Sequence, residues 1–323
     1  MAEPSTTSTE SPISGASIRR GDRVFGGLSK FAGVLVLIIM AAIAVFLIWR
    51  SIPSLTTNSV NFFTYEGWTP DANPPAFGIK ALAFGTMVAA FIAMVLAVPV
   101  GIGIALFISL YASRGLASTL AFITDLLAAV PSIIFGLWGL EVLLTGSQGI
   151  QIWMNDYLAW TVIFDNTLDL YGKSLFLASI VLAIMILPTV AAVSREVILQ
   201  VPPGHKEAAL ALGATRWEMV KMAVFPFAKP GMISGAMLGL GRALGETIAV
   251  ALILSAAFTI NVHLTEPGGN TFAANIALKW NEAGPNGLSA LIASGLVLFF
   301  LTLTVNMIAR WIIARRAEFS GAN

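Results

Sequence analysis

Long runs of apolar residues, separated by shorter polar segments, dominate the pattern along the chain. Six runs are long enough to cross a bilayer as helices, because a helix rises ~1.5 Å per residue and the hydrocarbon core is ~30 Å thick. The chain is therefore predicted to be an all-α polytopic membrane protein with six transmembrane helices, in which residues 25–323 form the transmembrane domain. The predicted spans are residues 31–49, 80–109, 119–144, 174–194, 230–257 and 288–312.

The polar segments between these runs predict the orientation of the chain. Residues 1–24 are rich in Ser and Thr, end in a basic cluster, and are predicted to be a disordered cytoplasmic tail. Most of the 18 Lys and Arg residues fall on the same side as the N-terminus. Because cytoplasmic segments carry the excess of Lys and Arg, we expect both termini in the cytoplasm.

Composition supports the membrane interpretation and excludes several kinds of site. The 323 residues are 57% hydrophobic and 11% charged, with a mean hydropathy of +0.85, whereas a soluble domain of this size carries far more charge. The chain has no cysteine, which excludes disulfides and thiolate metal sites. Its two histidines lie in different loops and predict no metal site, and a net charge of +1 does not suggest nucleic-acid binding.

One apolar run carries two charges in its middle. Arg242 and Glu246 lie four residues apart in residues 231–257, which are otherwise uncharged. Counted as a helix from Pro230, Arg242 lies ~18 Å along the axis, near the middle of the membrane. The spacing puts both side chains on one helix face, where they can pair. A charge at this depth is costly unless it faces protein, water or a partner, so we interpret the pair as part of a solute path. A structural ion pair is the alternative.

Two long segments are predicted on the external side. Residues 50–79 are rich in Pro and aromatic residues and are expected to form an ordered loop. Residues 145–173 are expected to contain a short amphipathic helix at the surface. These loops are interpreted either as a docking face for an external partner or as an aromatic belt at the membrane interface.

The cytoplasmic segment 195–229 is too amphipathic to be a simple linker. Apolar and charged residues alternate at helical spacing over residues 206–224. Proline and glycine precede this stretch, and Pro226 and Pro230 follow it as expected helix breakers. We predict a helix–turn–helix that lies flat on the membrane surface and turns near Gly213.

The same segment carries a motif with fixed spacing. Glu207, Ala208 and Ala209 are followed by Gly213 and, after a further stretch, by Pro226. This spacing resembles the EAA loop of the permeases of type I ABC importers, with Ala223 and Phe225 in place of the usual Ile and Leu. The resemblance implies that the short helix docks in a groove of an ATPase subunit. The alternative is an amphipathic helix that rests on lipid.

Two further segments narrow the resemblance. Residues 239–250, around Arg242, and residues 128–139, which include Ser132, are similar to two signatures of the phosphate-specific ABC importer permeases, in the form of the PstC-type subunit. The resemblance implies half of a path for inorganic phosphate in the inner membrane of a prokaryote, with no cofactor and no enzymatic activity of its own. The implied partners are a PstA-type sister permease, a PstB-type ATP-binding dimer that hydrolyses ATP, and an extracytoplasmic phosphate-binding protein of the PstS type.

The expected chemistry follows from the charge of phosphate. An arginine can grip two phosphate oxygens with its planar donors, so Arg242 is the predicted contact. Glu246 is expected to pair with Arg242 when phosphate is absent. Pro131 is expected to kink the third span and expose the hydroxyl of Ser132 to the path.

A stripe of small residues marks the fifth predicted span. Gly231, Gly235, Gly239 and Ala243 recur every four residues and form a smooth ridge on which another helix can pack. We interpret the ridge either as a moving seam between two permease subunits or as static close packing. The alternatives for the whole chain are a permease for another oxyanion, such as sulfate or molybdate, and a carrier driven by an ion gradient.

Overall fold

The computed structural model describes residues 20–317. The chain divides into two compact units, residues 1–49 and 50–323. The described part of the first unit is the beginning of α1 (Arg20–Thr57), whose apolar side chains are almost all exposed. Residues 20–24, which we predicted as the end of a disordered tail, belong to this helix. The rest of the predicted tail lies outside the described residues.

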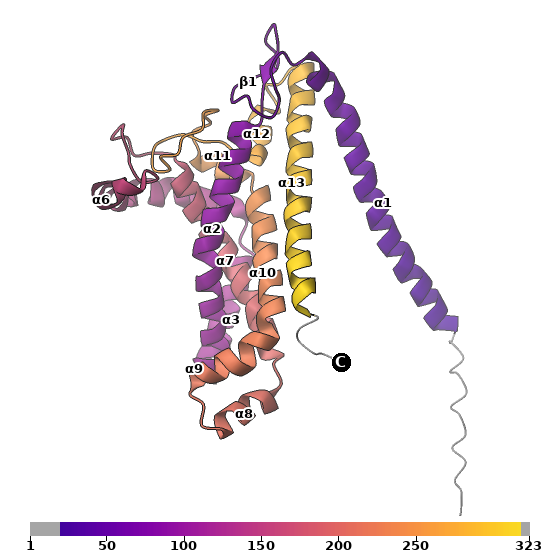
Figure 1. The fold of residues 1–323 in the computed structure, drawn as a ribbon, viewed down its shortest axis with the longest axis vertical. Coiled ribbons are helices and arrows are strands. Elements are labelled where there is room, and N and C mark those ends of the chain that lie inside the picture. The colour runs from indigo at the N-terminus through magenta and orange to yellow at the C-terminus, as the bar shows by residue number, and fades with distance from the viewer. Residues whose placement is uncertain (1–19, 318–323) are drawn as a thin grey trace, which may run out of the picture. The chain divides into compact units, whose positions relative to one another are not determined.

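The second unit is a bundle of long helices with shorter elements at both ends. Figure 1 shows α2, α7, α10 and α13 running side by side, and α7 packs against both α2 and α10. The elements are β1 (Trp68–Thr69), β2 (Ala76–Phe77), α2 (Lys80–Leu106), η1 (Phe107–Tyr111), α3 (Arg114–Ala128), α4 (Ser132–Trp138), η2 (Gly139–Leu143), α5 (Leu144–Gly146), α6 (Gln148–Leu158), η3 (Ala159–Thr161), α7 (Leu175–Leu199), α8 (Pro203–Ala211), α9 (Arg216–Met219), η4 (Val220–Val224), α10 (Phe225–Gly245), α11 (Ile248–Ile253), α12 (Phe272–Lys279) and α13 (Pro285–Ala317).

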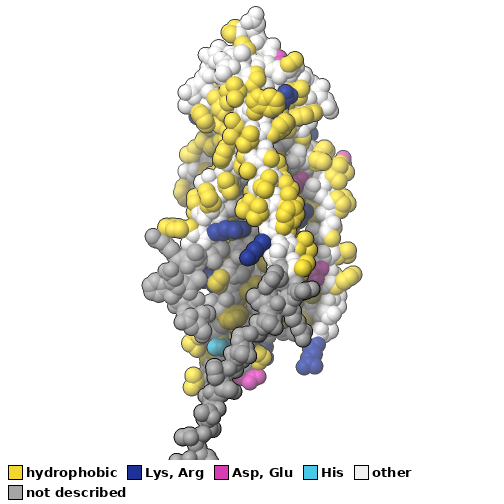
Figure 2. Space-filling view, turned by 90° about the vertical axis from the view of Figure 1, so that its right-hand side faces the viewer, with side chains coloured by type: hydrophobic (Ala, Val, Ile, Leu, Met, Phe, Trp, Pro, Cys, Tyr) yellow, Lys and Arg dark blue, Asp and Glu magenta, His cyan; other side chains and the backbone are white. Residues whose placement is uncertain are grey.

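The predicted fold class is confirmed. Among the described residues, five helices are long and apolar enough to cross a membrane, and a sixth span is present if α3 and the bent segment after it are counted together. Large hydrophobic side chains are exposed along these helices, and Figure 2 shows a face on which they outnumber the Lys and Arg side chains. Such exposed apolar surface is what contact with lipid requires.

The third predicted span is not one helix. Residues 119–144 divide between α3 and the segment that begins with α4, and the two directions differ by 91°. Pro131 causes the break, because it lacks an N–H group and excludes helical conformation at the residue before it. Helix α4 begins directly after this proline.

The fifth predicted span has different ends. Helical structure begins at Arg216 and continues to Gly245, so Pro226 and Pro230 do not break it as we expected. The π-helical turn η4 ends at Val224, and Pro226 lies in the first turn of α10, where a proline is tolerated because its missing N–H group has no helical partner there. The predicted helix over 230–257 is interrupted after Gly245, and α11 resumes at Ile248.

The two segments predicted to be external are ordered, although residues 50–57 of the first belong to α1. β1 pairs with β2 in a short antiparallel hairpin, and the Trp68 ring contacts Phe77 and stacks on Phe258. The carboxylate of Asp71 accepts hydrogen bonds from the N–H groups of Gly284 and Gly287 at the start of α13. The expected surface helix is α6, whose aromatic side chains are exposed.

Candidate functional site

The segments that follow the two helix breaks, α4 and α11, lie against each other. Helix α4 packs against α11, and the contact is close enough to require glycine. A Cβ atom on Gly136 would lie 2.7 Å from the Cα of Ala249, and one on Gly139, directly after α4, would lie 2.9 Å from Cδ1 of Ile253 in α11. The segments 128–139 and 239–250, far apart in the sequence, are therefore neighbours in the fold.

Arg242 lies near the end of α10 and reaches toward α3 and α7. Its half-buried side chain places Nη1 3.5 Å from the carbonyl oxygen of Ala128 and 3.4 Å from the hydroxyl of Thr189. Ala128 is the last residue of α3, where free carbonyl groups and the helix dipole attract a cation. Both contacts are long and both acceptors are neutral, so they leave the positive charge of Arg242 uncompensated.

The predicted pair between Arg242 and Glu246 does not form. Helix α10 ends at Gly245, and Glu246 has extended backbone angles instead of continuing the same helix face. Its buried carboxylate accepts a hydrogen bond from the N–H group of Ala249 at 3.2 Å and thereby caps α11. Within residues 20–317, Arg242 has no ion pair with an acidic side chain.

Ser132 lies close along the chain to Ala128, the residue that Arg242 contacts. It is the first residue of α4, half-buried, and follows the break at Pro131. Only a short turn separates it from Ala128, whose carbonyl group faces Arg242. The kink that we predicted at Pro131 is present.

A hollow of about 400 Å³ opens beside Arg242 between α10 and α13. Its polar lining comes from Ser234 and Arg242 on α10 and from Asn306 and Arg310 on α13. Ser234 lies eight positions before Arg242, so the hollow extends roughly 12 Å along α10. The sequence analysis missed Asn306 and Arg310. Asn306, the one amide side chain within the apolar run 288–312, is the signal that could have identified this face.

The glycine ridge of α10 is occupied by α7 of the same chain. A Cβ atom on Gly231 would lie 2.4 Å from Val197, and one on Gly235 would lie 3.0 Å from Val193. Gly239 is equally close to Val190. The interpretation of this ridge as a moving seam between two subunits is therefore wrong, because a helix of the same chain already fills it.

The segment 195–229 contains the predicted helix–turn–helix at one end of the bundle (Figure 1). Helix α8 carries Glu207 and Ala208 on its exposed side and Ala209 on its buried side. Gly213 has a φ of +85°, which favours glycine. Pro226 lies beyond the helix–turn–helix, within the continuous helix to Gly245.

A small core holds the helix–turn–helix to the long helices. Ala209 of α8 packs with Val220 and Val224 of η4 and with Ile198 near the end of α7. The exposed tip of the turn carries Leu212, whose side chain is 88% exposed. The described residues contain no group of three His, Asp or Glu side chains that could hold a metal ion.

Comparison with known proteins identifies relatives over nearly the whole chain. Residues 97–318 match the family described as the binding-protein-dependent transport system inner membrane component. A phosphate transport system permease protein PstC 2 of Mycobacterium tuberculosis is 44% identical over 314 residues, which cover 96% of this chain and 97% of the relative. The phosphate transport system permease protein PstC of Mycobacterium leprae is 47% identical, covering 93% and 95%.

Solved structures share the fold at low sequence identity. The alignment with the MetNI methionine ABC transporter in an inward-facing conformation has a TM-score of 0.51 and 17% identity, and covers 74% of this chain and 94% of that one. A bacterial ABC transporter involved in the import of the acidic polysaccharide alginate gives a TM-score of 0.53 and 18% identity, covering 91% and 99%.

Proposed function

Because this chain belongs to the family of binding-protein-dependent transport system inner membrane components, we propose that it is the permease subunit of an ATP-driven importer and that it carries inorganic phosphate. It is a multi-pass membrane protein of the inner membrane. The phosphate assignment draws on relatives named as phosphate transport permeases. The observation that carries it is Arg242, an arginine within the membrane helices with no acidic partner among the described residues.

An uncompensated cation in the membrane favours an anion as its partner. Phosphate at neutral pH carries one to two negative charges and presents several oxygen acceptors, which suit the planar donors of a guanidinium group. The neutral contacts of Arg242 hold its side chain at the junction of α3, α7 and α10 without neutralising it.

The hollow beside Arg242 supplies the next part of the proposed path. Phosphate released from Arg242 meets the amide of Asn306 and the guanidinium group of Arg310 along the same hollow. These groups offer hydrogen-bond donors, so the ion does not have to cross apolar surface alone. A PstA-type sister permease is proposed to complete the path on the open side.

The cytoplasmic segment offers a mechanical connection from an ATPase to Arg242. Helix α8 is proposed to dock on a PstB-type ATPase dimer, which hydrolyses the ATP. Its buried side contacts η4, which belongs to the continuous helix Arg216–Gly245. Arg242 lies near the other end of that helix, so a displacement of α8 is carried directly to the proposed phosphate contact.

The remaining assignments complete the proposal. Both termini are placed in the cytoplasm, and the ordered segments 58–79 and 145–173 face an extracytoplasmic PstS-type phosphate-binding protein. Glu207, Ala208 and Gly213 belong to the ATPase-docking segment. Ser132 contributes a hydroxyl group near the break between α3 and α4.

Reconstituted vesicles test this function. Vesicles that hold this chain, its sister permease, the ATPase and the binding protein are expected to accumulate labelled phosphate only with ATP, and excess sulfate or molybdate is expected not to compete. Accumulation that follows an ion gradient and ignores ATP would establish a gradient-driven carrier. Competition by sulfate or molybdate as strong as that by unlabelled phosphate would make the chain a permease for a different oxyanion.

A further inference from the structure

A second polar hollow lies away from Arg242, among η1, α3 and α7. Its volume is about 370 Å³. Arg195 of α7 lines it together with Asp125 of α3 and the neighbouring Glu196, and Ser109 of η1 contributes a hydroxyl group. Arg195 lies almost opposite the valines of α7 that pack on α10, because residues 193 and 195 are 200° apart around a helix. This hollow is therefore on a different face of α7 from the contact with α10.

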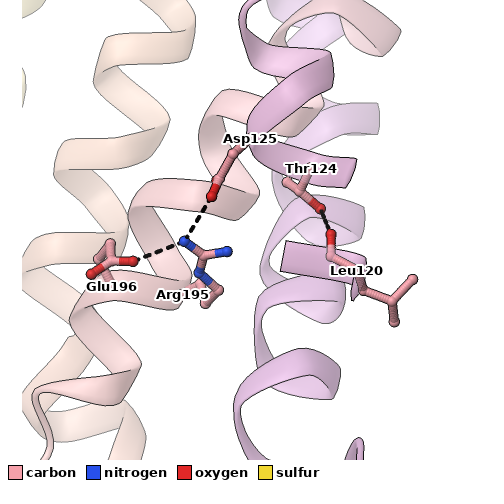
Figure 3. A network of polar contacts seen from close by, with 5 residues as sticks. All are labelled: Leu120, Thr124, Asp125, Arg195 and Glu196. Atoms are coloured by element: carbon pink, nitrogen blue, oxygen red, sulfur yellow. Dashed lines mark hydrogen bonds and ion pairs between the residues drawn. The ribbon is translucent and has the colours of Figure 1, made fainter. Parts of the chain in front are cut away.

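Arg195 is only partly satisfied by the two carboxylates. Figure 3 shows its guanidinium group between Asp125 and Glu196. A single nitrogen, Nη2, donates to both, at 3.2 Å to Asp125 and 2.9 Å to Glu196. The other two nitrogens, Nε and Nη1, are buried without a hydrogen-bond partner, and so is the hydroxyl oxygen of Ser109. Buried donors without an acceptor are costly, so the hollow is built to receive an acceptor-rich group.

The charges of the lining define that group further. The Arg195 side chain is 12% exposed, whereas those of Asp125 and Glu196 are 51% and 61% exposed. One guanidinium and two carboxylates give a negative lining, which disfavours a simple anion. A group that carries both a phosphate and an ammonium satisfies the donors and the carboxylates together. Its phosphate oxygens accept hydrogen bonds from Arg195 and Ser109, and its ammonium donates to the exposed carboxylate oxygens.

The rim of the hollow is apolar. Phe122 is 67% exposed and Leu199 is 55% exposed, and both line the hollow. Leu199 is the last residue of α7, at the end of the bundle that leads into α8. Polar groups inside and exposed apolar side chains at the edge match the headgroup and the acyl chains of a lipid at the membrane interface.

We propose that this hollow binds the phosphoethanolamine headgroup of an aminophospholipid. The lipid phosphate contacts Arg195 and Ser109, the ammonium contacts Asp125 and Glu196, and the acyl chains lie along Phe122 and Leu199. The bound lipid fastens α3 to α7 close to the end of α3 that Arg242 contacts. This proposal does not rest on the identity of the transported ion.

Native mass spectrometry of the full-length chain in detergent tests the proposal. The chain is titrated with phosphatidylethanolamine, with phosphatidylglycerol and with inorganic phosphate. We expect one phosphatidylethanolamine to bind at least about 10-fold more tightly than either alternative, the ratio that corresponds to ~1.4 kcal/mol. Absence of a retained lipid would mean that water fills the hollow. Equal binding of phosphatidylglycerol would show that the ammonium group is not recognised. Displacement by inorganic phosphate would show that the hollow binds the free ion and not a lipid headgroup. Each of these three results overturns the proposal.

Three variants and one matched control locate the site. Arg195→Gln and Ser109→Ala are each expected to weaken phosphatidylethanolamine binding, and Glu196→Gln is expected to reduce the preference over phosphatidylglycerol. Arg114→Gln makes the same change of charge at an exposed residue that does not line the hollow, and is expected to bind like the wild type. Equal affinity in Arg195→Gln and Arg114→Gln would overturn the proposal. If Arg195→Gln fails to fold, Ser109→Ala and Glu196→Gln decide in its place.

Discussion

Replacing Gly231 with alanine tests the close contact between α10 and α7. A Cβ atom at this position would lie 2.4 Å from Cγ2, 2.6 Å from Cγ1 and 3.0 Å from Cβ of Val197. These distances are far below van der Waals contact. Valine in a helix has one strongly preferred rotamer and cannot turn away. The helices must therefore separate locally, which costs about 1–3 kcal/mol in a well-packed core.

A matched control isolates this cost. Gly231→Ala also gains about 1 kcal/mol from the higher helix propensity of alanine, and Gly103→Ala in α2 has the same gain without any atom within 4 Å of the new Cβ. The difference between the two variants in free energy of unfolding is therefore the overpacking cost. We expect Gly231→Ala to be less stable than Gly103→Ala by about 1–3 kcal/mol.

The assay is unfolding of the full-length chain in mixed micelles, with Val197→Ala added to Gly231→Ala as a rescue. Removing the two methyl groups of Val197 makes room for the new Cβ, so the double variant is expected to recover most of the loss caused by Gly231→Ala. Equal stability of Gly231→Ala and Gly103→Ala, or the absence of any recovery, would refute the packing that we describe for the glycine ridge.

Three further predictions concern the loop of Glu266, the turn at Gly213 and the proposed path. Burial acts to raise the pKa of Glu266, but hydrogen bonds from Thr167 and Asn261 hold it below its ordinary value. Glu266→Gln should therefore lower the melting temperature at neutral pH, through a loss of about 1.5–3 kcal/mol. Since the folded-state pKa is depressed, this loss is complete above the unfolded value of about 4.3 and disappears as the pH falls through the folded value. Gly213→Ala forces a left-handed conformation on alanine and should cost about 1–2 kcal/mol, measured by unfolding; an unchanged value would contradict the turn geometry. Arg310→Gln should slow ATP-dependent phosphate uptake by about 10-fold, equivalent to ~1.4 kcal/mol, without loss of complex assembly, and wild-type uptake would exclude Arg310 from the path.

Local signals in the sequence were sufficient for much of the fold. Uninterrupted apolar runs predicted the spans that became α2, α7 and α13, and Gly213 marked the turn between α8 and α9. The breaks were harder to predict. Pro131 interrupts a span, whereas Pro226 and Pro230 lie within continuous helical structure. Whether a proline breaks a helix thus depended on neighbouring backbone geometry that the residue pattern does not encode.

The candidate site could be predicted only in part. The depth and charge of Arg242 singled it out, but its partners Ala128 and Thr189 are 114 and 53 residues away in the sequence. Spacing suggested Glu246 as its partner, and the end of α10 at Gly245 removed that contact. In the sequence, Arg310 contributed only to the charge pattern that predicts the topology. The packing of α13 on α10 brings it to the same hollow as Arg242.

Uptake of labelled phosphate by reconstituted complexes with Arg242→Gln tests the central claim most directly. Lys229→Gln is the matched control, because Lys229 is an exposed cation on the same helix that does not line the hollow of Arg242. With equal amounts of assembled complex and with ATP present, we predict that Arg242→Gln abolishes uptake and that Lys229→Gln leaves it close to wild type. Wild-type uptake by the Arg242→Gln complex would contradict the account, because phosphate would then cross the membrane without the cation on which the proposed path depends.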